Sequence, residues 1–169
     1  EAMVQSSNIV FAKIASEVGA ERLFKMARAF GIGTKAFDNY IGEESGRLLT
    51  PSELTRDDRT LKTMGFGHAV SVTPIQMVMA YAAIANGGML MRPQIVKEWR
   101  NYKGDVVEKN KPQELRRVVS EQTASTIRKM LNRVANSGTA KRVASQKLGD
   151  VLFGGKTGTA EKYNKETRS

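Results

Sequence analysis

Two short motifs near opposite ends of the chain carry side chains that could do chemistry. The first is Ser6-Ser7-Asn8, and the second is Lys156-Thr157-Gly158-Thr159. A serine hydroxyl both donates and accepts hydrogen bonds, an asparagine amide offers a donor and an acceptor together, and a lysine ammonium carries a positive charge. These groups could move a proton, orient a peptide group and hold an anion.

Neither motif is specific by itself. All three side chains of Ser6-Ser7-Asn8 can accept hydrogen bonds from unpaired amides at a helix start, so helix capping is the simpler interpretation in isolation. The segment from Lys156 to Thr159 could be an ordinary strand end with a solvated lysine, because threonine suits strands and glycine marks a bend.

The order of the motifs and the sequence between them change this interpretation. Penicillin-binding proteins and class A β-lactamases combine a Ser-x-x-Lys nucleophile with a Ser-x-Asn type motif and Lys-Thr-Gly. The segment from Ser71 to Gly88 resembles the helix that these enzymes place between the last two motifs, and Gly155 to Lys162 resembles the third motif of class B enzymes of division and elongation. Essentially the whole chain is thus similar to part of a class B penicillin-binding protein, and class A enzymes match less well.

The resemblance implies roles for individual residues in acyl transfer to a serine. Ser6 is expected to relay a proton between the lysine of the nucleophile motif and the departing D-alanine nitrogen. Asn8 would hold the amide of the substrate backbone. Lys156 would supply positive charge for the terminal carboxylate of a D-Ala-D-Ala stem peptide and act on the Ser6 hydroxyl. We therefore expect Ser6 and Asn8 to line one wall of a cleft and Lys156 to line the opposite wall.

The remaining residues of the second motif are expected to bind substrate. Thr157 and Thr159 would donate hydroxyl groups to the same carboxylate, and the backbone amide of Thr159 would form half of the oxyanion hole. Gly158 would let its strand approach the nucleophile and the substrate closely.

The nucleophile motif itself is absent, because no serine in this chain is followed three positions later by lysine. In the family this motif lies upstream of the Ser-x-Asn motif, and further strands and a helix follow Lys-Thr-Gly. The resemblance therefore implies an α/β (α+β) fold, an antiparallel sheet flanked by helices, that is incomplete at both ends. Residues 1–169 would be a partial transpeptidase domain that forms no acyl-enzyme alone.

Local patterns predict the elements that position these motifs. Apolar residues at helical spacing predict helices over about 8–18 and 21–30, ending at Gly19 and Gly31, and then a long irregular connection to residue 72. Thr73, Pro74 and Gln76 form a capping box for a helix that is apolar on nearly every face and should be buried.

Further along the chain, strand-like segments around a Lys103-Gly104-Asp105 turn predict a β-hairpin between residues 95 and 107. Ser120 should cap a helix that closes at residues 136–138. A last strand is expected from Leu152 to Ala160, followed by a polar tail over residues 161–169.

Composition excludes some functions and leaves others open. The 169 residues include no cysteine, and the net charge is +10 with scattered basic residues and no nucleic-acid-binding signature. His68 has no clustered ligand partner, so no metal is predicted, and no cofactor is implied.

The partners that the resemblance implies are stem peptides ending in D-Ala-D-Ala, β-lactams, the rest of the domain and other cell-wall synthesis proteins, with no nucleic acid.

The resemblance also implies an inner-membrane anchor and a catalytic domain outside the cytoplasm. Two alternatives stay open: a non-catalytic penicillin-recognising sensor or scaffold, and a basic nucleic-acid-binding domain whose affinity would depend steeply on salt.

Overall fold

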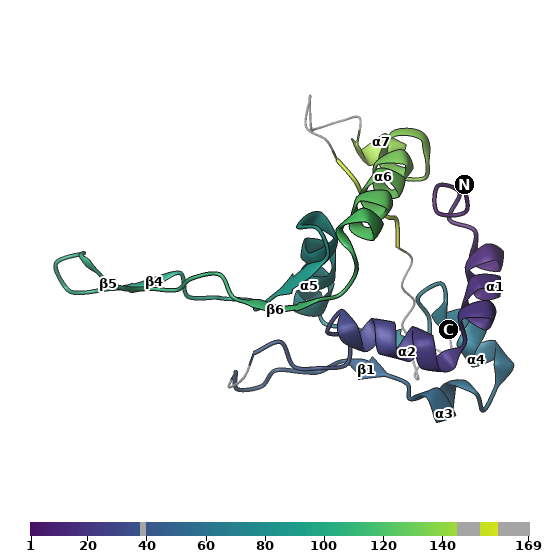
Figure 1. Cartoon of the computed structure of the whole chain (residues 1–169), viewed down its shortest axis with the longest axis horizontal. Helices are drawn as coiled ribbons and strands as arrows, with labels where there is room; N and C mark the ends of the chain where they lie inside the picture. Colours follow the sequence, from purple (N-terminus) through teal and green to yellow (C-terminus); the bar gives the residue numbers. More distant parts are fainter. Residues whose placement is uncertain (38–39, 145–152, 159–169) are drawn as a thin grey trace, which may run out of the picture. The chain divides into compact units, whose positions relative to one another are not determined.

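The structure is a computed structural model that describes residues 1–37, 40–144 and 153–158. The chain divides into two compact units, unit 1 with Glu1–Ser7 and Arg128–Ser169, and unit 2 with Asn8–Ile127. Each unit is described separately below (Figure 1). No helix in the described ranges has the length and hydropathy needed to cross a membrane.

Unit 1 is organised around the C-terminal part of helix α6 (Glu121–Ser137), which is followed by the short helix α7 (Lys141–Ala144). Val4 from the N-terminal turn packs with Val134 and Ala140 in a small apolar core. Gly138 makes this packing possible, because a Cβ atom there would lie 2.7 Å from the Val4 carbonyl oxygen. The N-terminal turn and α6 are thereby held together.

Unit 2 begins with a helical layer that packs around one core. Ala20, Leu54 and Met64 form this core, and α1 packs on both α2 and α4. The elements of the layer are α1 (Asn8–Val18), α2 (Ala20–Ala29), β1 (Arg47–Leu48), α3 (Pro51–Leu54), α4 (Asp58–Met64) and β2 (Val70–Ser71), with β1 and β2 paired antiparallel.

A second core in unit 2 lies between helix α5 (Pro74–Ala85) and strand β3 (Met89–Met91), which pairs antiparallel with β6 (Glu114–Arg117). Met79, Ala83 and Leu90 are buried there. From β6, the guanidinium of Arg116 donates to the Ala29 carbonyl oxygen at 2.8 Å, which caps the C-terminal end of α2.

Gln76 on α5 connects three separate segments of unit 2. Its side chain is 1% exposed, and its amide nitrogen donates to the carbonyl oxygens of Thr34 and Ser45 at 2.6 and 2.8 Å. Its amide oxygen accepts from the Thr73 backbone amide at 3.0 Å. All of these groups would lose a hydrogen-bond partner if the amide were removed.

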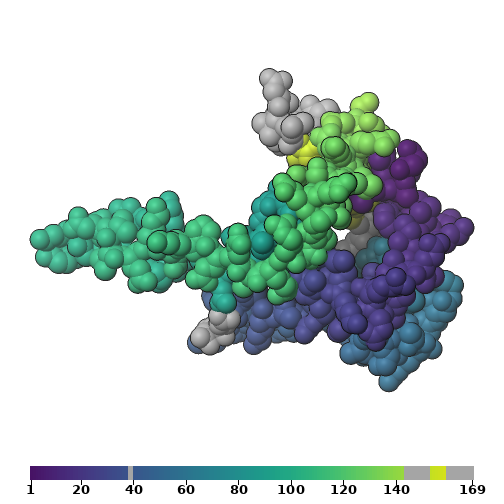
Figure 2. All heavy atoms as spheres, in the orientation of Figure 1, coloured from purple at the N-terminus to yellow at the C-terminus, as the bar shows by residue number. Residues whose placement is uncertain are grey.

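Strands β4 (Glu98–Arg100) and β5 (Val106–Lys109) form an antiparallel hairpin that extends away from α5 and β6 (Figures 1 and 2). The Asn101 side chain fixes its turn, because Oδ1 accepts from the backbone amides of Lys103 and Asp105 at 2.9 and 3.0 Å. Every residue of β5 is exposed.

Several predicted elements are confirmed. The helix over residues 8–18 has the predicted bounds, and the second helix is one residue earlier than predicted at each end. Gly19 and Gly31 follow the two helices with φ angles of 79° and 90°. The Thr73 capping box, the hairpin and the helix capped by Ser120 are also present.

Three predictions about elements were wrong. Residues 31–72 are not irregular throughout, since they contain α3, α4 and the β1–β2 pair, whose segments are too short to show a period. Helix α5 is not buried all round: Met77, Val78 and Tyr81 are 44%, 62% and 39% exposed.

The third error concerns the last predicted strand. Residues 153–158 have no regular secondary structure, although a strand was expected from Leu152 to Ala160. A strand needs a hydrogen-bonded neighbouring strand. Among the described residues, the backbone of this segment instead bonds to α6, through Phe153 and Gly155, and to the Lys156 side chain, through Thr157. The polar tail over 161–169 lies outside the described residues.

Candidate active site

Ser6 lies in a tight turn with an unusual backbone conformation. Its φ angle is 53°, in the left-handed region that costs a residue with a side chain about 1 to 3 kcal/mol. The turn is held by hydrogen bonds from the Ser6 amide to the Met3 carbonyl at 3.3 Å and from the Ser7 amide to the Ala2 carbonyl at 3.0 Å. The buried side chain of Val4 anchors this turn by packing against Val134 and Ala140.

The ammonium group of Lys156 contacts this turn. Its Nζ atom donates to Ser6 Oγ at 2.7 Å, although the two residues are 150 positions apart in the sequence. It also donates to the carbonyl oxygen of Thr157 at 2.9 Å and to Thr157 Oγ1 at 3.3 Å. Partial burial lowers the pKa of Lys156 below its ordinary value of 10.5.

Helix α6 holds the segment that carries Lys156. The Asn132 side chain donates to the Phe153 carbonyl oxygen at 2.8 Å, and the Gly155 amide donates to the Leu131 carbonyl oxygen at 3.3 Å. A Cβ atom at Gly154 would lie 3.2 Å from the Leu131 Cβ, so the glycine permits this close approach. One helix therefore anchors both Ser6, through Val4, and Lys156.

Thr139 is a contact of the site that the sequence analysis missed. Its hydroxyl lies 2.9 Å from Thr157 Oγ1, and either hydroxyl could be the donor. The turn that presents Thr139 follows α6 directly and is fixed by hydrogen bonds from the Gly138 and Ala140 amides to Val134 O at 3.1 and 3.3 Å. Asn136-Ser137-Gly138 was interpreted only as a helix end, and nothing in that pattern indicates a contact with Thr157.

The polar contacts in unit 1 form a continuous path from Thr139 through Thr157 and Lys156 to Ser6. Because Lys156 donates to Ser6 Oγ, the hydroxyl proton of Ser6 must point to another acceptor. If Thr139 donates to Thr157 Oγ1, the Thr157 hydroxyl proton is likewise directed elsewhere. The arrangement can present two oriented hydroxyl donors beside one cation.

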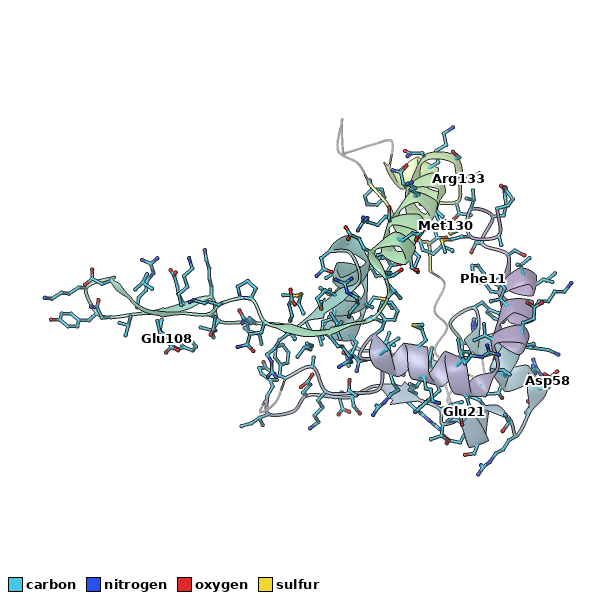
Figure 3. All side chains as sticks on the ribbon, viewed as in Figure 1. Phe11, Glu21, Asp58, Glu108, Met130 and Arg133 are labelled. Atoms are coloured by element: carbon cyan, nitrogen blue, oxygen red, sulfur yellow. The ribbon has the colours of Figure 1, made fainter. Side chains whose placement is uncertain are left out.

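Figure 3 labels Met130 and Arg133 on α6 in the same unit. The Arg133 guanidinium lies 3.7 Å from the Glu1 carboxylate, a pair in which both side chains are mostly exposed. Such a pair contributes little to stability, so the apolar core and the hydrogen bonds above do most of the positioning.

The remaining predicted site residues are placed less fully. Asn8 begins α1, is exposed and belongs to unit 2. Gly158 has no described atom within 4 Å of where a Cβ would lie, so the close approach expected there would have to involve substrate or the nucleophile motif. Thr159 lies outside the described residues.

Comparison with known proteins supports the motif analysis. A family model described as "Penicillin binding protein transpeptidase domain" matches residues 1–169. Stage V sporulation protein D of Bacillus subtilis is 37% identical over 163 residues, which cover 96% of this chain and 24% of that relative. The chain therefore spans about a quarter of that relative's length.

Solved structures share the fold. The D,D-transpeptidase domain of a peptidoglycan glycosyltransferase from Eggerthella lenta gives a TM-score of 0.83 at 29% identity, covering 96% of this chain and 42% of that one. An imipenem acyl-enzyme complex of penicillin-binding protein A from M. tuberculosis gives 0.80 at 29% identity, covering 95% and 35%. These matches confirm the predicted α/β fold class.

Proposed function

Because this chain belongs to the penicillin-binding protein transpeptidase family, we propose that it forms part of a peptidoglycan D,D-transpeptidase that works through a serine acyl-enzyme. Residues 1–169 would be one part of its transpeptidase domain. The substrates are stem peptides ending in D-Ala-D-Ala, and β-lactams bind as their mimics. The intact protein would be anchored in the inner membrane with the catalytic domain outside the cytoplasm, beside other cell-wall synthesis proteins.

The observation that carries the proposal is the 2.7 Å hydrogen bond between Lys156 Nζ and Ser6 Oγ. It joins the two motifs whose combination is typical of penicillin-recognising enzymes. Helix capping by Ser6 does not require a partly buried lysine beside the serine. A solvated lysine does not require a serine as its partner. The contact therefore supports catalysis over both simpler interpretations.

The chemistry needs a serine nucleophile that this chain does not contain. That serine oxygen forms a bond to the carbonyl carbon of the penultimate D-alanine, and the bond to the terminal D-alanine nitrogen breaks. The base of the Ser-x-x-Lys motif takes the proton of the attacking serine hydroxyl, and Ser6 relays a proton from that base to the leaving nitrogen. Ser6 Oγ accepts the hydrogen bond from Lys156 and does not donate in it. The Ser6 hydroxyl proton is therefore not used in that bond and can take part in this step.

The other motif residues would hold the substrate. Lys156 and the hydroxyl of Thr157 bind the terminal carboxylate, with Thr159 as a second hydroxyl donor, while Asn8 orients the substrate amide. The Thr159 backbone amide would stabilise the oxyanion, and loss of one such donor typically slows acyl transfer about 10²- to 10³-fold. Gly158 leaves room for the substrate.

A fluorescent penicillin tests the proposal on the intact protein that contains this chain. We expect a stoichiometric covalent adduct on a Ser-x-x-Lys serine outside residues 1–169, and none on this chain alone. Lys156→Met should slow adduct formation, whereas Lys129→Met, a change at an exposed lysine of the same unit, should not. An intact protein that forms no adduct would instead fit the non-catalytic sensor or scaffold.

A further inference from the structure

An open groove of about 450 Å³ lies at the base of the β4–β5 hairpin, entirely within unit 2. Figure 2 shows the hairpin projecting clear of the other coloured segments in that view. Figure 3 labels Glu108 on the projecting part. The transpeptidation proposal gives this groove no role, because Ser6, Asn8 and Lys156 are not among its lining residues.

The groove has aromatic walls. Phe37 and Tyr40, whose ring centroids lie 5.5 Å apart, line it together with Trp99 on β4. Tyr40 is 57% exposed and Trp99 is 46% exposed. Large rings left in contact with water in this way are typical of binding surfaces.

Three amide side chains and one cation also line the groove. Gln94 and Asn110 each donate their amide nitrogen to a backbone carbonyl oxygen at 2.7 Å, which fixes the side chain and leaves its carbonyl oxygen as an acceptor. Gln113 also lines the groove, and Arg92 is the one charged residue among the described lining residues.

This combination favours a sugar chain over other ligands. Aromatic faces stack on the C–H faces of sugar rings, and amides bind hydroxyl and acetamido groups. An apolar peptide or lipid would cover the amide oxygens of Gln94 and Asn110 without offering them a donor, which costs free energy. Single-stranded nucleic acid also stacks on aromatic rings, but it needs several cations along its backbone, and one lines the groove.

We propose that this groove binds the glycan strand of peptidoglycan, a chain of N-acetylated amino sugars, through residues other than those of the transpeptidation proposal. The inference rests on the proposed function, which supplies a glycan polymer as substrate. The groove would hold the strand while a stem peptide reacts.

The test uses the intact protein and peptidoglycan glycan strands from which the stem peptides have been removed, so that the transpeptidation residues have nothing to bind. We expect Trp99→Ala to weaken binding about tenfold or more, as truncation of an anchoring tryptophan does at other interfaces. Tyr40→Ala should also weaken glycan binding, because Tyr40 lines the same groove. Tyr102→Ala is the matched control, since Tyr102 is 93% exposed on the same hairpin and does not line the groove.

Acylation by a fluorescent penicillin, measured on the same variants, separates the two proposals. Equal acylation in all variants together with glycan binding lost in Trp99→Ala and Tyr40→Ala supports the groove. Wild-type protein that is acylated but does not bind stripped glycan overturns the groove and leaves the transpeptidase proposal standing. Equal loss in Tyr102→Ala, or equally tight binding of a single-stranded DNA oligonucleotide, also overturns it. Wild-type protein that binds glycan but is never acylated would contradict the transpeptidase proposal and not the binding of glycan by the groove.

Discussion

The hydroxyl of Thr139 is expected to position the acylation site without touching substrate. Thr139→Val keeps the shape of the side chain but removes its hydrogen bond to Thr157 Oγ1, which is 2.9 Å long. A neutral hydrogen bond contributes about 0.5 to 1.5 kcal/mol, and the lower part of that range applies because this pair is exposed. A loss of about 0.5 to 1 kcal/mol would slow acylation about two- to fivefold.

The assay is the second-order rate constant for acylation of the intact protein by a fluorescent penicillin. Thr139→Ser is the matched control, because it retains the hydroxyl and should restore the rate. Thermal unfolding should shift by no more than a few degrees in Thr139→Val, as a loss of about 1 kcal/mol or less produces, and should match wild type in Thr139→Ser. The reasoning is refuted if Thr139→Val acylates at the wild-type rate, or if Thr139→Ser is slowed as much as Thr139→Val.

Three further predictions concern stability and pH dependence. Gln76→Leu should lower the free energy of unfolding by about 3 kcal/mol, because three part-buried backbone groups lose their hydrogen-bond partner. Met77→Leu, at a 44% exposed site, should cost under about 1.5 kcal/mol. Similar losses for the two variants in a denaturant titration would contradict this. Gly88→Ala should destabilise the protein more than Gly104→Ala. The two glycines have similar φ angles, 95° and 90°, but only at Gly88 would a Cβ meet a backbone oxygen, at 2.2 Å. Equal denaturation midpoints for the two variants would count against this. The pKa of Lys156 is lowered, so its ammonium loses its proton at a pH below the ordinary value of 10.5. The acylation rate should therefore already fall with rising pH before pH 10.5 is reached. Lys156→Arg should remove this fall, because arginine does not titrate in that range.

Local signals in the sequence predicted the four longest described helices, α1, α2, α5 and α6, but not the shorter α3, α4 and α7. Gly19 marks a helix end because its backbone adopts a positive φ. The Thr73 capping box marks a helix start. Each of these signals is contained in a few consecutive residues, so it can be recognised in the sequence. The family was likewise predicted from two short motifs and the segment between them, and the match over residues 1–169 confirms it.

Contacts between distant residues were not predictable in the same way. Gln76 was interpreted only as part of a capping box, yet it also binds Thr34 and Ser45, which lie 42 and 31 positions away. Thr139 contacts Thr157 across 18 positions without any pattern that relates them. The predicted strand around Lys156 failed for a related reason, because strand formation depends on a partner strand and not on local propensity alone.

The contact between Lys156 and Ser6 is tested most directly by a double-mutant cycle on acylation of the intact protein. Ser6→Ala, Lys156→Met and the double variant are compared by their second-order rate constants with a fluorescent penicillin. Two groups in direct contact at 2.7 Å should be coupled, with the double variant differing from the sum of the single effects by about 1 to 3 kcal/mol. Single effects that add to within about 0.5 kcal/mol would contradict the claim that Ser6 and Lys156 act together.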